Sequence, residues 1–165
     1  MPAPAPFTIP PAQWAADRTE IESVRRAVFI VEQGVPEHEE WDCADAGCRH
    51  VLARTAKRDA VGTGRLEPTG KIGRVAVLPQ YRGSGVGSAI VSHLVNLASG
   101  LGLTRVYLHA QTTALGFYER LGFRVEGPEF DEVGIPHRRM SLGIEQRDEQ
   151  QAGRHRDTKH PLDAR

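Results

Sequence analysis

The chain has 165 residues, 39% of them hydrophobic and 25% charged, which is enough for one globular domain with a full core. Basic and acidic residues number 21 each, so the formal net charge is zero and neither nucleic acid binding nor an acidic solvating role is favoured. Two cysteines are too few for a disulfide framework, and no apolar run approaches the ~20 residues that span a bilayer.

The N-terminal sequence MPAPAPFTIPP lacks the basic and apolar regions of a signal peptide. Its alternation of proline with alanine favours extended chain, which we predict for residues 1–17. Without a targeting or membrane-spanning segment, the expected location is the cytoplasm.

A first helix is predicted from about Glu20 to Val31. Thr19 and Glu22 have the spacing of a capping box, and apolar residues follow at helical intervals. The next stretch (32–47) is acidic and irregular, which predicts a loop or a broken second helix.

Within that acidic stretch, Glu37, Glu39 and Glu40 form a charge run whose ordinary interpretation is a solvated surface. The cysteines, Cys43 and Cys48, lie close to two histidines. Their C-x4-C spacing is not typical of a zinc site, so we expect reduced structural cysteines and no metal.

Several segments have the composition of strands. Two of them flank a short polar linker and predict an antiparallel hairpin, and a later pair encloses the loop PEFDEVGIP (128–136). In order, the predicted strands are RHVLART (49–55), AVGTGRL (60–66), IGRVAVL (72–78), TRVYLHA (104–110), FRVEG (123–127) and HRRMSLG (137–143).

Two further helices are predicted between these strands. Apolar residues recur at helical spacing from Val86 to Leu101, and Gly100 or Gly102 closes that helix. The segment TTALGFYERLG (112–122) predicts a short helix with a threonine cap and a glycine just past its end. The resulting order predicts one α/β (α+β) domain with a strand–loop–helix unit at its centre.

The segment QYRGSGVGS (80–88), here called the glycine loop, joins a predicted strand to a predicted helix. This arrangement places backbone N–H groups and a helix N-terminus around an anion, with hydroxyls and the charge of Arg82 nearby. The alternative is a tight turn that needs glycine at positive φ. The loop lacks the lysine of a P-loop, and its G-x-G-x-G follows several strands, unlike a dinucleotide fingerprint.

A third pattern fits both the loop and the segment after it. VAVLPQYRGSGVGSAIV resembles the acyl-CoA pyrophosphate loop (Q/R-x-x-G-x-G/A) of the GNAT N-acetyltransferase superfamily. LHAQTTALGFYERLGF resembles the second signature of that family, A-x-x-F-Y-x-x-x-G-F. The resemblance covers about residues 18–143, and VFIVEQGVPEHEEWD and GIPHRRM are similar to the ElaA-like branch. The polar segment 144–165 has no apolar periodicity, which predicts a disordered tail.

The resemblance implies a mixed, mostly antiparallel sheet of about six to seven strands, flanked by helices, with a splayed central strand pair. It also implies transfer of an acetyl group from acetyl-CoA to a primary amine, more readily of a small molecule than of a protein. A catalytically silent acyl-CoA-binding module is the alternative, and a domain whose glycines only turn the chain is a third. We expect no metal, no nucleic acid or membrane partner, and a monomer or homodimer.

The resemblance also assigns site residues. The oxyanion donor is expected to be the backbone N–H of Val77 or Leu78. The expected acyl-CoA contacts are Val75, Ala76, Val77, Gln80, Arg82, Gly83, Ser84, Gly85, Val86, Gly87, Ser88, Ala114, Phe117 and Tyr118.

For catalysis, Tyr118 matches the family position whose hydroxyl protonates the CoA thiolate; its alternative role is packing beside Phe117. The general base stays open. His109 and Gln111 share one strand face, and carboxylates from the acidic stretch would suit a cationic acceptor. We therefore expect His109 and Glu32 to be catalytic with Tyr118. The expected acceptor contacts are Glu32, Gln33, Asp42, Gln111 and His137, with His38 and Glu39 as further candidates.

Overall fold

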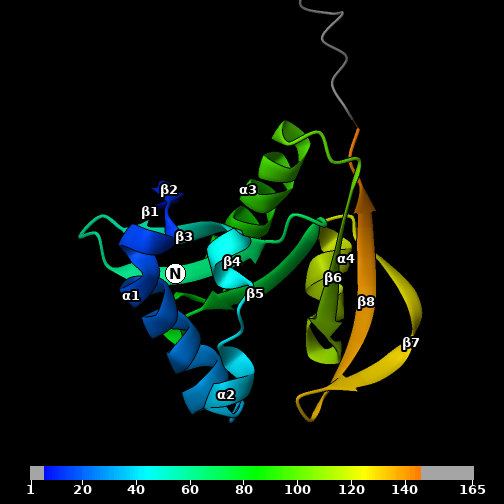
Figure 1. The fold of residues 1–165 in the computed structure, drawn as a ribbon, viewed down its shortest axis with the longest axis horizontal. Helices are drawn as coiled ribbons and strands as arrows, with labels where there is room; N and C mark the ends of the chain where they lie inside the picture. Colours follow the sequence, from blue (N-terminus) through cyan, green and yellow to red (C-terminus); the bar gives the residue numbers. More distant parts are fainter. Residues whose placement is uncertain (1–5, 146–165) are drawn as a thin grey trace, which may run out of the picture.

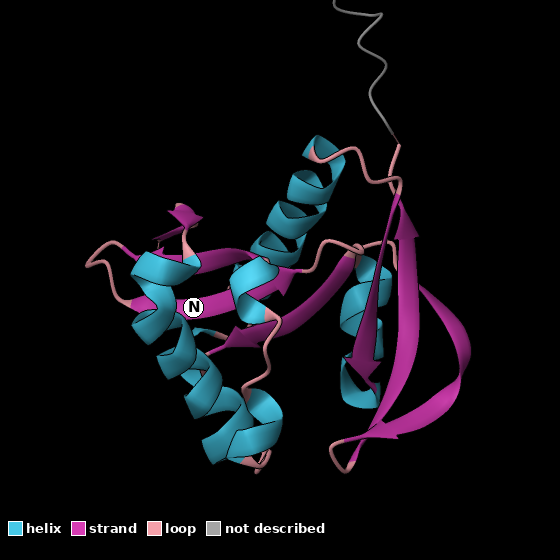
Figure 2. Ribbon diagram, viewed as in Figure 1, coloured by secondary structure: helices cyan, strands magenta, loops and turns pink. Residues whose placement is uncertain are grey.

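The computed structural model describes residues 6–145 of the chain. A twisted sheet forms its centre, and a separate hairpin, β7–β8, extends the sheet on one side (Figures 1 and 2). The longer elements are α1 (Trp14–Arg25), β3 (Arg49–Thr55), β4 (Ala60–Leu66), β5 (Lys71–Val77), α3 (Val86–Gly100), β6 (Arg105–Gln111), α4 (Leu115–Arg120), β7 (Arg124–Glu132) and β8 (Ile135–Gly143). The shorter ones are β1 (Phe7–Thr8), β2 (Pro11–Ala12), the π-helix η1 (Arg26–Glu32), α2 (Glu37–Glu40) and the 3-10 turns η2 (Asp45–Gly47), η3 (Pro79–Tyr81) and η4 (Thr112–Ala114).

The strands follow the order β1-β3-β4-β5-β6-β8-β7, and β2 also pairs with β3. Among the described residues, all pairings are antiparallel except that of β5 with β6. The predicted mixed fold is thereby confirmed. Its strand number rises to eight because two short strands form in the segment predicted to be extended without pairing.

Helices α1 and α3 cover opposite faces of the sheet. Ala76 of β5 packs with Val24 of α1 and Val28 of η1, whereas its neighbours Val75 and Val77 pack on the core that contains α3. Since successive residues of a strand face opposite sides, the two helices lie on either side of β5. Strand β5 is therefore packed against a helix on each of its two faces.

Two glycines of β4 let α3 lie directly on the sheet. A methyl group at Gly62 would stand 2.8 Å from the Ile90 side chain, and one at Gly64 would stand 2.8 Å from Ile90 and 2.9 Å from Leu94. All three distances are too short for carbon atoms in contact, so glycine at both positions permits this approach. The close packing fixes where α3 begins, and with it the glycine loop.

The first helix begins at Trp14, earlier than the predicted Glu20, so the extended segment ends at Gln13. The backbone N–H of Gln13 donates to the Asp17 carboxylate at 2.8 Å, which satisfies one donor at the helix start. The helix then widens into η1, where Gln33 N–H donates to the Val28 carbonyl at 3.1 Å, five residues back. The widened turn carries the chain from α1 to Glu32.

The loop predicted at residues 128–136 is instead mostly strand. β7 continues to Glu132, and Val133 and Gly134 form a tight two-residue turn with φ of 50° and 76°. The pairing with β8 shifts between Glu126 and Phe130, so Pro128 lies at a bulge that needs no ladder donor. Cross-strand pairing outweighed the local turn signals. The predicted tail lies almost wholly outside the described residues.

Buried ion pairs anchor the acidic stretch. Arg25 of α1 is 1% exposed and donates to Glu40 and to Asp45, both at 2.7 Å. Arg65 of β4 donates to the same Asp45 at 2.8 Å. Burial raises the pKa of Glu40, which is 3% exposed, although neighbouring arginines oppose this effect. The prediction of a solvated Glu40 was wrong. Three arginines from different elements, Arg25, Arg65 and Arg74, converge on this stretch.

Candidate active site

The central parallel pair of strands separates after a short contact. β5 and β6 pair only at Lys71–Tyr107 and Ile72–Leu108, and from there to their C-terminal ends no pairing joins them. β4 continues to pair with β5 as far as Val77. One edge of β5 therefore stays free over its last residues. We call this opening the splay; it is the separated strand pair that the sequence resemblance implied.

The glycine loop lies where β5 ends and α3 begins. Gly83 and Gly85 have φ of 74° and 89°, and nothing lies within 4 Å of a methyl group placed at either. The first helical bond runs from Ala89 N–H to the Gly85 carbonyl at 3.0 Å, so the N–H groups of the preceding first turn lack helical acceptors. Unfilled space and unpaired donors at a helix start fit a phosphate group.

Two polar side chains of the loop, both predicted to contact acyl-CoA, make hydrogen bonds within the protein. The Ser84 hydroxyl donates to the Tyr81 carbonyl at 2.5 Å, so it stabilises the loop instead of pointing outward. The guanidinium of Arg82 is held by Glu32 and by the Val77 carbonyl. The positive φ at Gly83 and Gly85 agrees with the turn interpretation of the glycines, and the open space beside them leaves room for the predicted anion.

Of the two backbone donors proposed for the oxyanion, one is engaged. Leu78 N–H donates to the Val61 carbonyl of β4 at 2.9 Å. Because neighbouring residues of a strand direct their N–H groups to opposite sides, Val77 directs its N–H toward β6 and the splay. The hydrogen bond to β4 excludes Leu78 N–H as the oxyanion donor. Val77 N–H is the remaining candidate for that role.

Helix α4 places Phe117 against the glycine loop and Tyr118 against Phe117. The Phe117 ring lies 4.9 Å from the Tyr118 ring, and a methyl group at Gly87 of α3 would stand 3.3 Å from Phe117. Burial raises the pKa of Tyr118 to about 12, so its hydroxyl stays protonated at neutral pH. Within the part of the chain that the structure describes, this hydroxyl has no hydrogen-bond partner. It is a donor without an acceptor.

Glu32 and Arg82 form a two-point ion pair. Arg82 Nη1 and Nη2 donate to the two Glu32 carboxylate oxygens at 2.8 and 2.5 Å, and the pKa of Glu32 is lowered by this contact. Arg82 Nε donates to the Val77 carbonyl at 3.0 Å. The residue predicted as a base and the residue predicted to contact phosphate are thus in direct contact with each other.

His109 and His137 meet at a carboxylate that the sequence interpretation did not single out. Glu132 of β7 lies 3.2 Å from His109 Nδ1 and 3.6 Å from His137 Nε2. The Phe130 ring packs against both imidazoles, at 5.0 and 6.0 Å between centroids. Glu132 was placed in a loop by the sequence interpretation; the hairpin register of β7 and β8 pairs it with Ile135, two residues from His137 along β8. His109 Nε2 has no hydrogen-bond partner among residues 6–145.

Gln33 and Gln111 bridge the front of the splay. Gln111 Nε2 donates to the side-chain oxygen Oε1 of Gln33 at 2.8 Å, which connects the end of η1 to the end of β6. Asp42, by contrast, is taken by Arg65 through two bonds of 2.8 Å and lies 3.4 Å from Arg74. These arginines hold the pKa of Asp42 far below its usual range. Asp42 is part of the ion-pair network around the acidic stretch, apart from the other acceptor residues.

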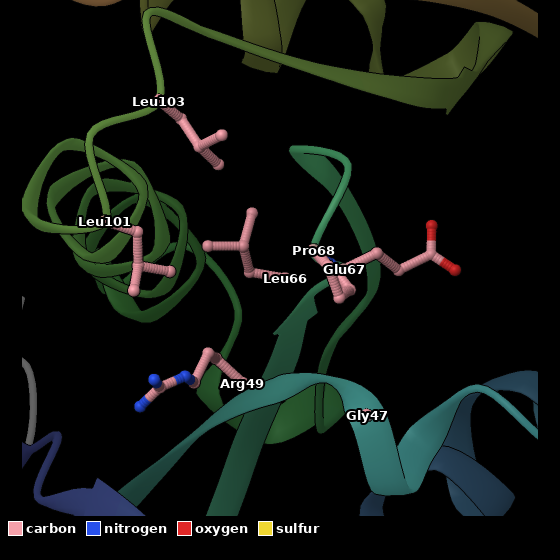
Figure 3. Close-up of a pocket in the computed structure, with 7 residues that line it drawn as sticks. All are labelled: Gly47, Arg49, Leu66, Glu67, Pro68, Leu101 and Leu103. Carbon is pink, nitrogen blue, oxygen red and sulfur yellow. The ribbon is translucent and has the colours of Figure 1, made fainter.

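A separate hollow lies at the far end of α3. It is bordered by Leu66 at the end of β4 and by Leu101 and Leu103 after α3, with Arg49 and Glu67 at its rim (Figure 3). The helix of 15 residues separates it from the glycine loop by about 20 Å, at 1.5 Å per residue. None of the predicted site residues lies in this hollow.

The cysteine and histidine candidates do not assemble into a metal site. Cys43 and Cys48 are free thiols, and His50 is stacked on Trp14 with Nε2 2.8 Å from the Asp45 carbonyl. Among residues 6–145, no three His, Cys, Asp or Glu side chains are arranged to hold a metal ion. In the same part of the chain, no helix combines the length and apolar character needed to cross a membrane.

A parallel strand pair that separates beside a glycine loop and a helix start is typical of one class of acyltransferase fold. Residues 16–144 match the acetyltransferase (GNAT) domain family, and the chain belongs to this family of acyltransferases. YyaT of Bacillus subtilis is 42% identical over 135 residues, which cover 78% of this chain and 90% of YyaT.

Solved structures agree with this assignment. An acyl-CoA N-acyltransferase from Pseudomonas aeruginosa has a TM-score of 0.71 and 28% identity, covering 83% of this chain and 98% of that one. Escherichia coli ElaA has a TM-score of 0.72 and 26% identity, with the same two coverages of 83% and 98%.

Proposed function

We propose that this acyltransferase moves the acetyl group of acetyl-CoA to a primary amine of a small molecule, as an ElaA-like member of its family. The observation that carries the proposal is the splay, which leaves one edge of β5 unpaired directly before the glycine loop. The likeness to ElaA and the segments VFIVEQGVPEHEEWD and GIPHRRM support the branch. The cytoplasmic location stays a prediction from the sequence.

The donor is proposed to lie along β5 with its phosphates at the glycine loop. Acetyl-CoA supplies an activated thioester when bound. The backbone groups of Val75 and Val77 on the edge that no strand pairs with would bind its pantetheine arm, as a neighbouring strand would. The first-turn N–H groups of α3 and the open positions at Gly83 and Gly85 would receive the pyrophosphate. Gln80, Ser88, Ala114 and Phe117 are proposed to line the same path.

Two donors are proposed to stabilise charge during transfer. Val77 N–H would donate to the thioester carbonyl oxygen, because it is the backbone donor that faces the splay. The Tyr118 hydroxyl would donate to the departing sulfur, since it is protonated and has no acceptor among residues 6–145. Both groups are fixed before any ligand arrives, so little reorganisation is needed.

His109 is proposed as the general base. Its Nδ1 faces Glu132 at 3.2 Å, which orients the ring and leaves Nε2 to accept a proton from the amine. Glu32 is a weaker candidate for this step while Arg82 lowers its pKa. We propose that Glu32 instead attracts the positively charged acceptor.

The acceptor is proposed to enter beside Gln33, Gln111 and His137. The Gln33–Gln111 bridge narrows this side of the splay, which favours a small amine over a protein side chain. Glu32 and Glu132 add negative charge there, which favours a cationic amine. Asp42 is left out of this group because Arg65 already neutralises it.

Thermal unfolding with and without ligand tests donor binding first. Acetyl-CoA should raise the Tm, while ATP and NAD at equal concentration should not, because only acetyl-CoA fits both the loop and the β5 edge. Thiol release with a panel of small amines then tests transfer. Stabilisation without thiol release would indicate a silent acyl-CoA-binding module. A larger Tm rise with ATP than with acetyl-CoA would contradict the proposal.

A further inference from the structure

Arg82 occupies the backbone edge that the proposed function assigns to the acyl donor. Val77 directs its N–H and carbonyl to the splay, because Leu78 pairs with β4 on the other side. Arg82 Nε donates to that Val77 carbonyl at 3.0 Å. A pantetheine arm that pairs with Val77 must therefore first displace the Arg82 side chain.

Glu32 holds Arg82 in this position. Its two carboxylate oxygens accept from both terminal nitrogens of the guanidinium, a planar two-point contact that fixes the orientation of the side chain. The partners come from segments 50 residues apart, the end of η1 and the glycine loop. Both side chains remain accessible, at 35% and 45% exposure, so the pair can open without unfolding its surroundings.

We propose that Glu32 keeps Arg82 as a plug over Val77, and that acyl-CoA binding exchanges the Glu32 carboxylate on Arg82 for a phosphate of the donor. This inference rests on the proposed function. The guanidinium binds phosphate with the same two-point geometry as a carboxylate, so Arg82 gains a new partner as it leaves the old one. The exchange frees the Glu32 carboxylate for a cationic acceptor only after the donor is in place.

Two probes separate the plug from simple charge effects: CoA, which carries phosphates, and pantetheine, which carries none. Their affinities are measured by NMR titration for the wild type, Glu32→Gln and Arg82→Ala. Glu20→Gln is the matched control, because Glu20 makes a similar two-point contact with Arg54, at 2.6 and 2.8 Å, between α1 and β3. Thermal unfolding of each variant checks that it is folded.

Glu32→Gln should tighten both CoA and pantetheine by about two- to fivefold, the factor that an exposed ion pair contributes. Arg82→Ala should tighten pantetheine, because the Val77 carbonyl is uncovered, and weaken CoA, because a phosphate partner is lost. Glu20→Gln should change neither affinity.

Other outcomes overturn the inference. If Glu32→Gln tightens CoA but leaves pantetheine unchanged, Glu32 acts only by repelling phosphates and there is no plug. If Arg82→Ala leaves pantetheine unchanged or weakens it, Arg82 does not cover Val77. If the wild type binds neither probe, the proposed function itself is wrong. If the wild type binds the probes but the variants do not change the affinities as expected, only the plug proposal is wrong.

Discussion

Replacing Tyr118 by phenylalanine isolates the role of one hydroxyl. The ring packs against Phe117 at 4.9 Å and Phe123 at 5.8 Å, and phenylalanine keeps both contacts. Because the hydroxyl has no partner among the described residues, its removal orphans no other polar group. The free energy of unfolding should change by less than about 0.5 kcal/mol, as for a substitution that breaks no structural feature.

The expected loss of rate follows from the raised pKa of Tyr118. With a phenol pKa of about 12, full proton transfer to a thiolate whose acid has a pKa of about 8.5 is uphill by roughly 5 kcal/mol. The hydroxyl then contributes to the transition state one hydrogen bond to a charged sulfur. Such a bond lowers the activation free energy by about 1.5–3 kcal/mol, which is roughly 10- to 150-fold in rate. This lies at the lower end of the range for general acids, about 10²–10⁴-fold.

The assay follows thiol release with an amine identified by the panel described above, and calorimetry gives the affinity for CoA. kcat should fall by the stated factor while the Kd for CoA stays within about threefold, since an interaction made mainly in the transition state is lost. An unchanged kcat would refute the reasoning and make Tyr118 a packing residue. Equal losses in affinity and rate would mean that the hydroxyl binds the donor in its ground state.

Two further predictions concern stability and pH. Arg25→Ala should lower the free energy of unfolding in urea by about 3–5 kcal/mol, because it removes the buried cation that two buried carboxylates share and leaves each with one arginine fewer; a loss below about 1 kcal/mol would contradict the importance of the network. In a spectrophotometric alkaline titration, one tyrosine should ionise near pH 12 and be missing in Tyr118→Phe. The raised folded-state pKa stabilises the fold below the ordinary value of about 10, and this stabilisation is lost as pH rises through about 12. The absence of an ionisation near pH 12 in the wild type would contradict the buried environment of Tyr118.

Local sequence patterns predicted those elements whose signals lie within the element itself. The strands at 49–55 and 60–66 have the predicted bounds, because their apolar composition and the polar linker between them are local features. Helix α3 ends where the glycines of its sequence indicated, with Gly102 at φ of 81° just past its last turn. The glycine loop and the α4 segment carried the family resemblance for the same reason.

The sequence pattern failed where a partner distant in the chain decided the outcome. Glu40 looks like a solvated residue in a charge run, but Arg25 draws it into a buried pair. Glu132 looks like part of a polar loop, but the pairing of β7 with β8 brings it to His109 and His137. No local pattern encodes such contacts, since their free energy depends on the position and burial of both partners.

The sequence by itself determined the family, the strand–loop–helix unit and the residue types available for chemistry. Only the tertiary structure decided how those residues are used: which backbone donor faces the splay, which carboxylate orients His109, and that Arg82 is held by Glu32. The physical reason is that periodicity and turn chemistry act over a few residues, whereas ion pairs and strand register depend on segments brought together by burial of the core. Val77 shows the difference: its strand was evident from the sequence, but the direction of its N–H was fixed by the pairing of β4 with β5.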